Sequence, residues 1–164
     1  MTPVSEQRAC VFCGDLRTLT KEHLFRDSLQ GRIPASRTLA RERTGGSADA
    51  DRTEMPISIF ELTVRAVCAR CNSGWMNAID SEIEDVLVAL ANGSRRDIPP
   101  QRVVAFARWA TRVALLRTLS ERARNGDAHE SLFHDFYGRQ LPPAGTVVRM
   151  GLLRNLAYEG GSNS

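Results

Sequence analysis

All four cysteines of this chain fall in two Cys-x-x-Cys pairs, Cys10–Cys13 and Cys68–Cys71. Four soft thiolates are the ligand set of a closed, tetrahedral structural zinc site. Closing the 54-residue loop between the pairs costs about 3.5 kcal/mol of chain entropy, whereas a structural zinc contributes roughly 10–16 kcal/mol. We therefore expect one Zn²⁺, coordinated by Cys10, Cys13, Cys68 and Cys71, to join the N-terminal turn to the middle of the chain.

A thiol redox protein is the alternative for two such pairs. A thioredoxin-like pair lies at a helix start after a buried strand, and Cys10 lacks that context. Four thiols with none left over favour the metal. Such a zinc is structural, because no coordination position remains for water.

The length and composition are those of one ordinary globular domain. The chain has 164 residues, of which 42% are apolar and 25% charged, enough for a single hydrophobic core. Its longest apolar stretch, 103–116, is interrupted by Arg108 and Arg112, so we expect no membrane-spanning helix and no membrane partner. The first ten residues lack a secretory signal pattern. A cytoplasmic location, without disulfides, is the expectation.

The first half of the chain is expected to be mainly extended. Residues 16–25 favour an extended segment, and 30–56 are rich in Gly, Ser, Asp and Arg, which is typical of a loop. Ile57–Val67 is β-branched and apolar, which predicts a strand.

The clearest helix covers 72–91. Asn72 or Ser73 is expected to cap its start and Asn92-Gly93 to end it. Trp75 is expected to pack against the cysteine pairs. One apolar stripe runs along the helix with a period close to 3.6 residues, and consists of Met76, Ile79, Ile83, Val86, Leu87 and Leu90.

A second helix is expected from Pro99-Pro100 to about Arg124, partly within the core. A short helix near Ser131–Tyr137 and a strand near Thr146–Leu153 follow. This order of elements predicts an α+β fold.

Charge is unevenly distributed over the chain. The net charge is +3, but segments 24–43 and 95–124 are basic. Clustered bases are what binding to a phosphate backbone requires. However, 21 of the 22 bases are arginine, which a GC-rich genome also produces, so charge alone leaves nucleic-acid binding open. Segment 72–94 is acidic. Its acids are expected to form mostly a solvated helix face, with support of a metal ion as a minor alternative: Asp80, Glu82, Glu84 and Asp85.

Two polar motifs lie close to the cysteines in sequence. Glu22-His23 follows the first pair by nine residues, and Asn72 directly follows the second. If zinc joins the pairs, both motifs are tethered near the same metal. The Glu22 carboxylate and the Asn72 carbonyl can then bind a hard divalent cation, and His23 can act as a general base on water beside it.

Together these residues resemble the HNH endonucleases of the ββα-metal class, in the branch that carries zinc knuckles. The strings EHLF…L and CARCNSGWM are similar to a bacterial and phage subfamily that reads EH-x-F-P-x-W-L … C-x-x-C-N-x-G-W-M. The match covers 10–29 and 68–90. The Pro and Trp of that pattern are Arg26 and Ser28 in this chain.

The resemblance implies a zinc-stapled ββα-metal core over residues 1–94, with a loop insertion at 30–56. Residues 95–164 would be a helical extension that ends in a short strand and packs on the core as one compact domain. The second strand and the helix of the motif would be Ile57–Val67 and 72–91.

The resemblance also implies an activity. Glu22 and Asn72 would bind a catalytic Mg²⁺ or Mn²⁺, and His23 would deprotonate the water that attacks a DNA phosphodiester bond. The ion would stabilise the leaving 3′-oxygen and the developing charge. Nucleic acid, DNA before RNA, is the expected partner.

Phosphate contacts are expected from the insertion beside the site. Its candidate residues are all arginines: Arg26, Arg32, Arg37, Arg41 and Arg43.

A non-catalytic zinc module of the same fold, binding nucleic acid or a protein partner, is the alternative function. Residues 24–67 contain no Asn, whereas many HNH enzymes carry a central Asn that orients the catalytic His. This absence favours the alternative. The retained Glu22-His23 and Asn72 favour the enzyme, because a binding-only module does not need a ligand pair and a base together.

Overall fold

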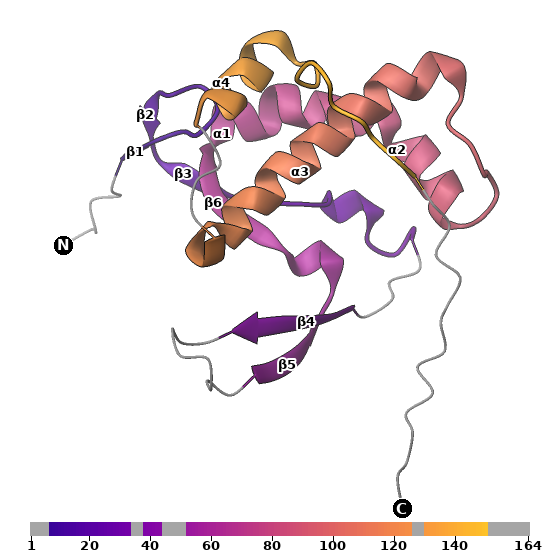
Figure 1. Cartoon of the computed structure of the whole chain (residues 1–164), viewed down its shortest axis with the longest axis horizontal. Helices are drawn as coiled ribbons and strands as arrows, with labels where there is room; N and C mark the ends of the chain where they lie inside the picture. Colours follow the sequence, from indigo (N-terminus) through magenta and orange to yellow (C-terminus); the bar gives the residue numbers. More distant parts are fainter. Residues whose placement is uncertain (1–6, 34–37, 44–51, 126–129, 151–164) are drawn as a thin grey trace, which may run out of the picture.

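The computed structural model describes residues 7–33, 38–43, 52–125 and 130–150 (Figure 1). This part of the chain consists of helices and three antiparallel sheets of two strands each. The predicted α+β class is therefore confirmed.

The central sheet pairs β3 (Leu19–His23) with β6 (Thr63–Cys68). Its register shifts between Thr20 and Glu22, where β6 contributes one residue more than β3. A bulge of this kind bends the sheet and turns the side chains that follow it. It lies immediately before Glu22 and His23.

A minimal sheet frames the first cysteine pair. β1 (Arg8–Ala9) pairs with β2 (Leu16–Arg17), and Cys10 comes directly after β1. Cys68 is the last residue of β6. Each cysteine pair therefore begins where a strand ends.

The segment 30–56, predicted as a loop, contains a hairpin instead. β4 (Thr38–Arg43) pairs with β5 (Arg52–Ile57) in continuous register. The loop prediction is wrong because polar strands carry no strong alternation of apolar residues. Pro56, which cannot donate to a strand ladder, further obscures the pattern. The hairpin lies on the side of β3 and β6 away from the helices (Figure 1).

The strand predicted over Ile57–Val67 is interrupted. Ser58 caps a 3₁₀ turn over Ile59–Glu61: its hydroxyl accepts from the Phe60 N–H at 3.3 Å, and the Glu61 carboxylate accepts from the Ser58 N–H at 3.2 Å. Such a capping box satisfies two backbone donors at the turn. The strand therefore divides into the end of β5 and the whole of β6.

A helical segment starts at the second cysteine pair and continues to residue 91. It consists of α1 (Ala69–Cys71), a wide turn with π-type hydrogen bonds over Asn72–Met76, and α2 (Asn77–Ala91). The segment begins three residues earlier than predicted, so Asn72 and Ser73 lie inside it and do not cap it. The cap prediction is wrong because the backbone enters a helical turn at Ala69, directly after β6 ends at Cys68.

The end of α2 agrees with the prediction. Asn92 is its C-cap residue, and Gly93 follows with φ +72°. A left-handed residue after a helix is usually glycine, because other side chains strain there.

Two further helices complete the described fold. α3 (Val103–Asn125) follows a 3₁₀ turn at Pro100–Arg102, and α4 (Glu130–Arg139) follows α3, both as predicted. The predicted terminal strand is wrong over 146–150, which pair with no strand in the described part of the chain. Apolar sequence alone does not make a strand without an open sheet edge beside it. Residues 151–153 lie outside the described residues.

The buried apolar side chains form two clusters. The larger one gathers the cysteines with residues of β6, α3 and α4, including Val67, Leu116 and Phe133. The smaller one lies between the α2 stripe and the start of α3. Phe25 and Trp109 pack against both clusters. The predicted stripe of α2 is buried from Met76 to Leu87.

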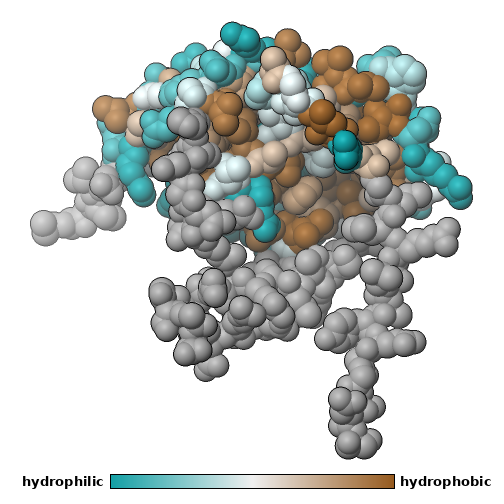
Figure 2. Space-filling model, viewed as in Figure 1, coloured by the Kyte–Doolittle hydropathy of each residue, from teal (hydrophilic) through white to brown (hydrophobic). Residues whose placement is uncertain are grey.

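The surface mixes polar and apolar residues (Figure 2). Several apolar side chains are exposed, among them Val103, Val104, Leu141 and Val147. Within the described ranges no helix combines the length and apolarity that a bilayer crossing requires.

Arg112 of α3 is a charged residue at the centre of the fold. Its side chain is 1% exposed. Its Nη1 donates to the Leu24 carbonyl at 3.0 Å, and its Nη2 lies 2.5 Å from Glu22 Oε1 and 3.1 Å from Asp80 Oδ2. One guanidinium thus ties together β3, α2 and α3.

Replacing Arg112 with Met is expected to destabilise the protein strongly. Met fills similar space but leaves two buried carboxylates without their cation, and breaking a buried pair in this way typically costs about 3–5 kcal/mol. Chemical denaturation measures the loss in the free energy of unfolding.

Arg96→Met is the matched control, because Arg96 is exposed and surface substitutions usually change stability by about 0.5 kcal/mol or less. Equal stabilities of the two variants would show that the Arg112 cluster does not stabilise the fold.

Candidate metal centre and active-site cleft

The four cysteine sulfurs form one cluster. All four Sγ atoms lie within 4.8 Å of one another, and those of Cys13 and Cys68 are 3.8 Å apart. A tetrahedral zinc with Zn–S bonds of about 2.3 Å separates its sulfurs by about 3.8 Å. None of the four forms a disulfide. The cluster therefore has the ligands and the spacing of the predicted zinc site.

Backbone hydrogen bonds hold the two cysteine pairs together. The Val11 N–H donates to the Ala66 carbonyl at 3.0 Å, and the Cys68 N–H donates to the Cys10 sulfur at 3.4 Å. Gly14 closes the first turn with φ +74°, and a side chain there would also meet the His134 ring. These hydrogen bonds hold the two cysteine pairs side by side.

Burial and neighbouring sulfurs affect the pKa values of the cysteine thiols. Burial acts to raise the pKa of Cys10, but N–H groups directed at its sulfur outweigh burial and lower that pKa. Burial dominates at Cys13 and Cys71 and raises the pKa of both thiols. Neighbouring sulfurs also oppose their ionisation. A bound divalent cation compensates this repulsion and allows all four thiols to be thiolates.

Trp75 packs against the cluster, as predicted. Its ring centroid is 5.2 Å from that of Phe12, which lies within the first cysteine pair, and 5.7 Å from that of Phe136. Its indole N–H is buried without an acceptor of normal geometry. It nevertheless lies close enough to Cys71 to lower the pKa of that thiol, against the larger effect of burial. A Cys71 thiolate would be the acceptor that this N–H lacks.

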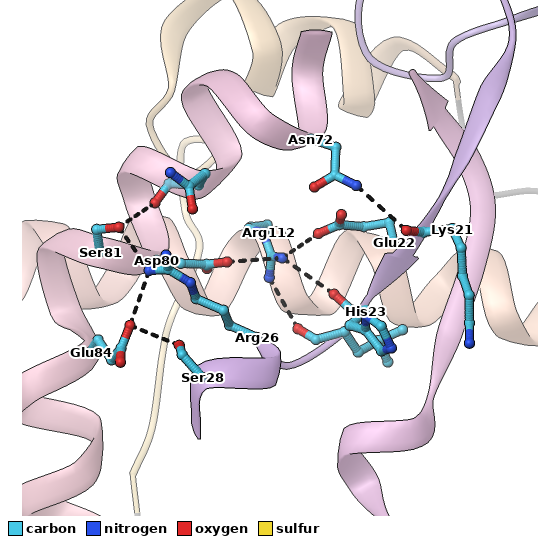
Figure 3. A network of polar contacts seen from close by, with 12 residues as sticks. Lys21, Glu22, His23, Arg26, Ser28, Asn72, Asp80, Ser81, Glu84 and Arg112 are labelled. Carbon is cyan, nitrogen blue, oxygen red and sulfur yellow. Dashed lines mark hydrogen bonds and ion pairs between the residues drawn. The ribbon is translucent and has the colours of Figure 1, made fainter. Parts of the chain in front are cut away.

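A cleft of about 170 Å³ lies among the polar side chains of Figure 3, and Asn72, which directly follows Cys71, is part of its lining. Its lining brings together residues from β3, α2, α3 and the turn after Cys71. The lining includes the three predicted site residues Glu22, His23 and Asn72. Asp80 and Arg112 line it as well.

Glu22 is the buried member of the predicted ligand pair. It is 5% exposed, and burial raises its pKa, although Arg112 and a hydrogen bond from Asn72 act to lower it. The Asn72 amide also donates to Thr20 Oγ1 at 3.3 Å and to the Lys21 carbonyl at 3.5 Å. Asn72 is therefore oriented by β3, on which Glu22 lies.

His23 is the half-buried member of the site. Its Nε2 lies 3.4 Å from Oδ1 of Asp27, the fourth residue after it in the chain. Asp27 is not among the site residues predicted from the sequence. An acid four residues after a candidate base is the signal that would have identified it.

The prediction that the acids of α2 form mostly a solvated face is wrong for Asp80. It is 6% exposed, and burial raises its pKa to about 6, against the lowering effect of Arg112. The other three acids of this face are less buried. The sequence signal for the buried acid was Arg112, which interrupts the apolar stretch of α3 and requires a partner of opposite charge.

Two of the predicted phosphate contacts are paired in the structure. Arg26 donates to Glu84 at 3.0 Å and to Ser81 at 2.7 Å, and Arg32 pairs with the same carboxylate. Ser28 also donates to Glu84, at 3.0 Å. These contacts bind the segment after His23 to α2 (Figure 3).

Of the other three predicted contacts, two lie in a strand of the described structure. Arg41 and Arg43 belong to β4 itself, whereas Arg37 lies outside the described residues.

Comparisons with protein-family models, with curated proteins and with solved structures found no match to this chain. The likeness to HNH endonucleases therefore rests on the sequence motifs.

The purified chain is expected to contain one zinc ion, measured by elemental analysis, and Cys68→Ser is expected to contain almost none. Serine does not replace a buried thiolate ligand, and lost metal binding is lost folding free energy. The melting temperature of the variant should therefore fall.

Wild type stripped of metal with a chelator is the control for this experiment. Its melting temperature should fall like that of the variant and recover when zinc is added. A Cys68→Ser variant that keeps both its zinc and its melting temperature would contradict the site.

The stability difference between wild type and Asp80→Asn is expected to depend on pH. The pKa of Asp80 rises from 3.8 to about 6 on folding, so the folded state binds the proton more tightly. Its contribution to stability is therefore greatest below pH 3.8 and is lost as the pH rises through about 6.

Denaturation in urea across this pH range measures the effect, with the exposed Asp85→Asn as the matched control. The advantage of wild type over Asp80→Asn should shrink as the pH rises. A difference that is constant or grows with pH would be the opposite of what burial of Asp80 requires.

Proposed function

We propose that this chain is a metal-dependent endonuclease of the HNH type that hydrolyses DNA phosphodiester bonds. The observation that carries the proposal is that Glu22, His23 and Asn72 line one cleft. Asn72 lies about 50 residues after Glu22 and His23 in sequence. A base and two oxygen donors beside a four-cysteine cluster are the parts that such chemistry uses.

His23 is the proposed general base. Its ring is half-buried at the cleft, which leaves room for a water molecule, and Asp27 lies at its Nε2. A carboxylate at one ring nitrogen orients the imidazole, so the other nitrogen, Nδ1, would accept the proton of the water. Asp27 thus takes the orienting role that the absent central Asn would have had.

Glu22 and Asn72 are the proposed ligands of Mg²⁺ or Mn²⁺. Their carboxylate and amide oxygens are the hard donors that these cations prefer, and β3 holds them side by side. When bound, the ion would stabilise the charge that develops on the phosphate and on the leaving 3′-oxygen.

Basic side chains near the cleft support DNA as the substrate. Arg26 and Arg32 share the single carboxylate of Glu84, so these three side chains together carry more positive than negative charge. Lys21 lines the cleft and is exposed. Charges of this kind contact phosphates without reading sequence. Arg37, Arg41 and Arg43 remain further proposed contacts.

One observation favours the alternative, a zinc module that binds nucleic acid or protein without cleaving it. Arg112 already neutralises one oxygen of Glu22, at 2.5 Å. A guanidinium in this position lowers the affinity of the Glu22 carboxylate for a second cation.

Plasmid cleavage by the zinc-loaded protein tests the proposal. Wild type is expected to cut the plasmid only with added Mg²⁺ or Mn²⁺. His23→Ala is expected to cut it at least about 10²-fold more slowly, because a general base contributes 10² to 10⁴ in rate.

His134→Ala is the matched control, since His134 is exposed on α4 and does not line the cleft. It should cleave like wild type. Cleavage that survives His23→Ala would remove His23 as the base, and binding of DNA without cleavage would favour the zinc module.

A further inference from the structure

Asp80 has an oxygen that nothing in the described structure satisfies. Its Oδ2 contacts Arg112 at 3.1 Å, but its buried Oδ1 has no hydrogen-bond partner. An unpaired charged oxygen in this position is costly, and native structures seldom keep one without a ligand, ion or water. Asp80 lines the same cleft as Glu22 and Asn72.

Arg112 fixes the relative position of the two buried carboxylates. Glu22 Oε1 and Asp80 Oδ2 contact the same guanidinium nitrogen, Nη2. Figure 3 shows the two side chains pointing toward Arg112 from opposite sides, Glu22 from β3 and Asp80 from α2. Each carboxylate thus gives one oxygen to Arg112 and keeps one for another partner.

The charges of this buried group do not balance. One guanidinium faces two carboxylates, and all three side chains are more than nine-tenths buried. Arg26 also attracts the charge of Asp80, but it is hydrogen-bonded to Ser81 and Glu84. A cation in the cleft would supply the missing positive charge and a partner for Asp80 Oδ1.

We infer that Asp80 is a third ligand of the divalent cation in this cleft, binding it through Oδ1 together with Glu22 and Asn72. The inference rests on the proposed function, because it concerns the same ion. Carboxylate and amide oxygens select Mg²⁺ or Mn²⁺, whereas the four sulfurs select Zn²⁺. The chain thus separates two metals by the chemistry of its ligands.

Titration of the zinc-loaded full chain with Mn²⁺ alone, followed by electron paramagnetic resonance of the free ion, tests this assignment. Wild type should bind one Mn²⁺. Asp80→Asn should bind it at least about tenfold more weakly. Loss of a hydrogen-bond partner of a metal ligand already lowers metal affinity by about tenfold or more, and loss of a ligand should lower it at least as much. Asp85→Asn, the same change at an exposed position of α2, should bind it like wild type.

A second measurement does not depend on the folding of any variant. Mn²⁺ broadens nuclear magnetic resonance signals of nearby groups, and in wild type the broadening should centre on the amides of Glu22, Asn72 and Asp80. Broadening centred elsewhere, no Mn²⁺ binding by wild type, or equal affinity in folded Asp80→Asn would each overturn the assignment.

Cleavage assays separate this inference from the proposed function. If Asp80→Asn binds Mn²⁺ and cuts DNA like wild type, Asp80 is not a ligand although the nuclease stands. If Asp80→Asn loses Mn²⁺ but wild type cuts no DNA, the cation site stands and the nuclease does not.

Discussion

The buried guanidinium of Arg112 is the interaction on which the rest of the structure depends. It joins β3, α2 and α3, and these three elements also line the cleft. A buried positive charge requires oxygen partners, and Nη1 and Nη2 of Arg112 have them, whereas its buried Nε has none in the described structure. The geometry that satisfies Arg112 is the same geometry that brings Glu22 and Asp80 together, so the stability of the fold and the shape of the cleft share one cause.

The cysteine cluster contributes a second constraint of a different kind. Strand pairing already holds the two cysteine pairs in contact, and the N–H groups around Cys10 favour its ionised form. A bound metal would hold the two pairs together in addition to these strand contacts. Asn72 follows Cys71 directly, and the turn that carries it is wide and irregular. This irregular turn is the link between the cysteine cluster and the cleft.

The sequence predicted the parts of the fold that repeat and the residues that stand in motifs. The stripe of α2 and the end of that helix at Gly93 follow from local spacing. The gathering of four cysteines follows from the ligand chemistry of zinc. It did not predict the β4–β5 hairpin, because pairing between polar strands leaves no periodic signal. It also misplaced Asp80, because burial of an acid is decided by a distant partner, Arg112. The positions of Glu22, His23 and Asn72 next to the cysteine pairs predicted that they lie near one another, and the resemblance implied their roles; the cleft that they share with Asp80 and Arg112 depends on long-range packing.

The helical segment that begins at Ala69 has a thermodynamic consequence. Cys71, Asn72 and Asp80 lie on it in succession, so an ion at the sulfurs and an ion in the cleft act on the same element. An ion that orders this helical segment lowers the entropy cost that binding of the other ion would otherwise carry. Linkage then makes the effect reciprocal: the factor by which zinc changes the affinity for a cleft cation equals the factor by which that cation changes the affinity for zinc. The two sites would behave as one cooperative unit.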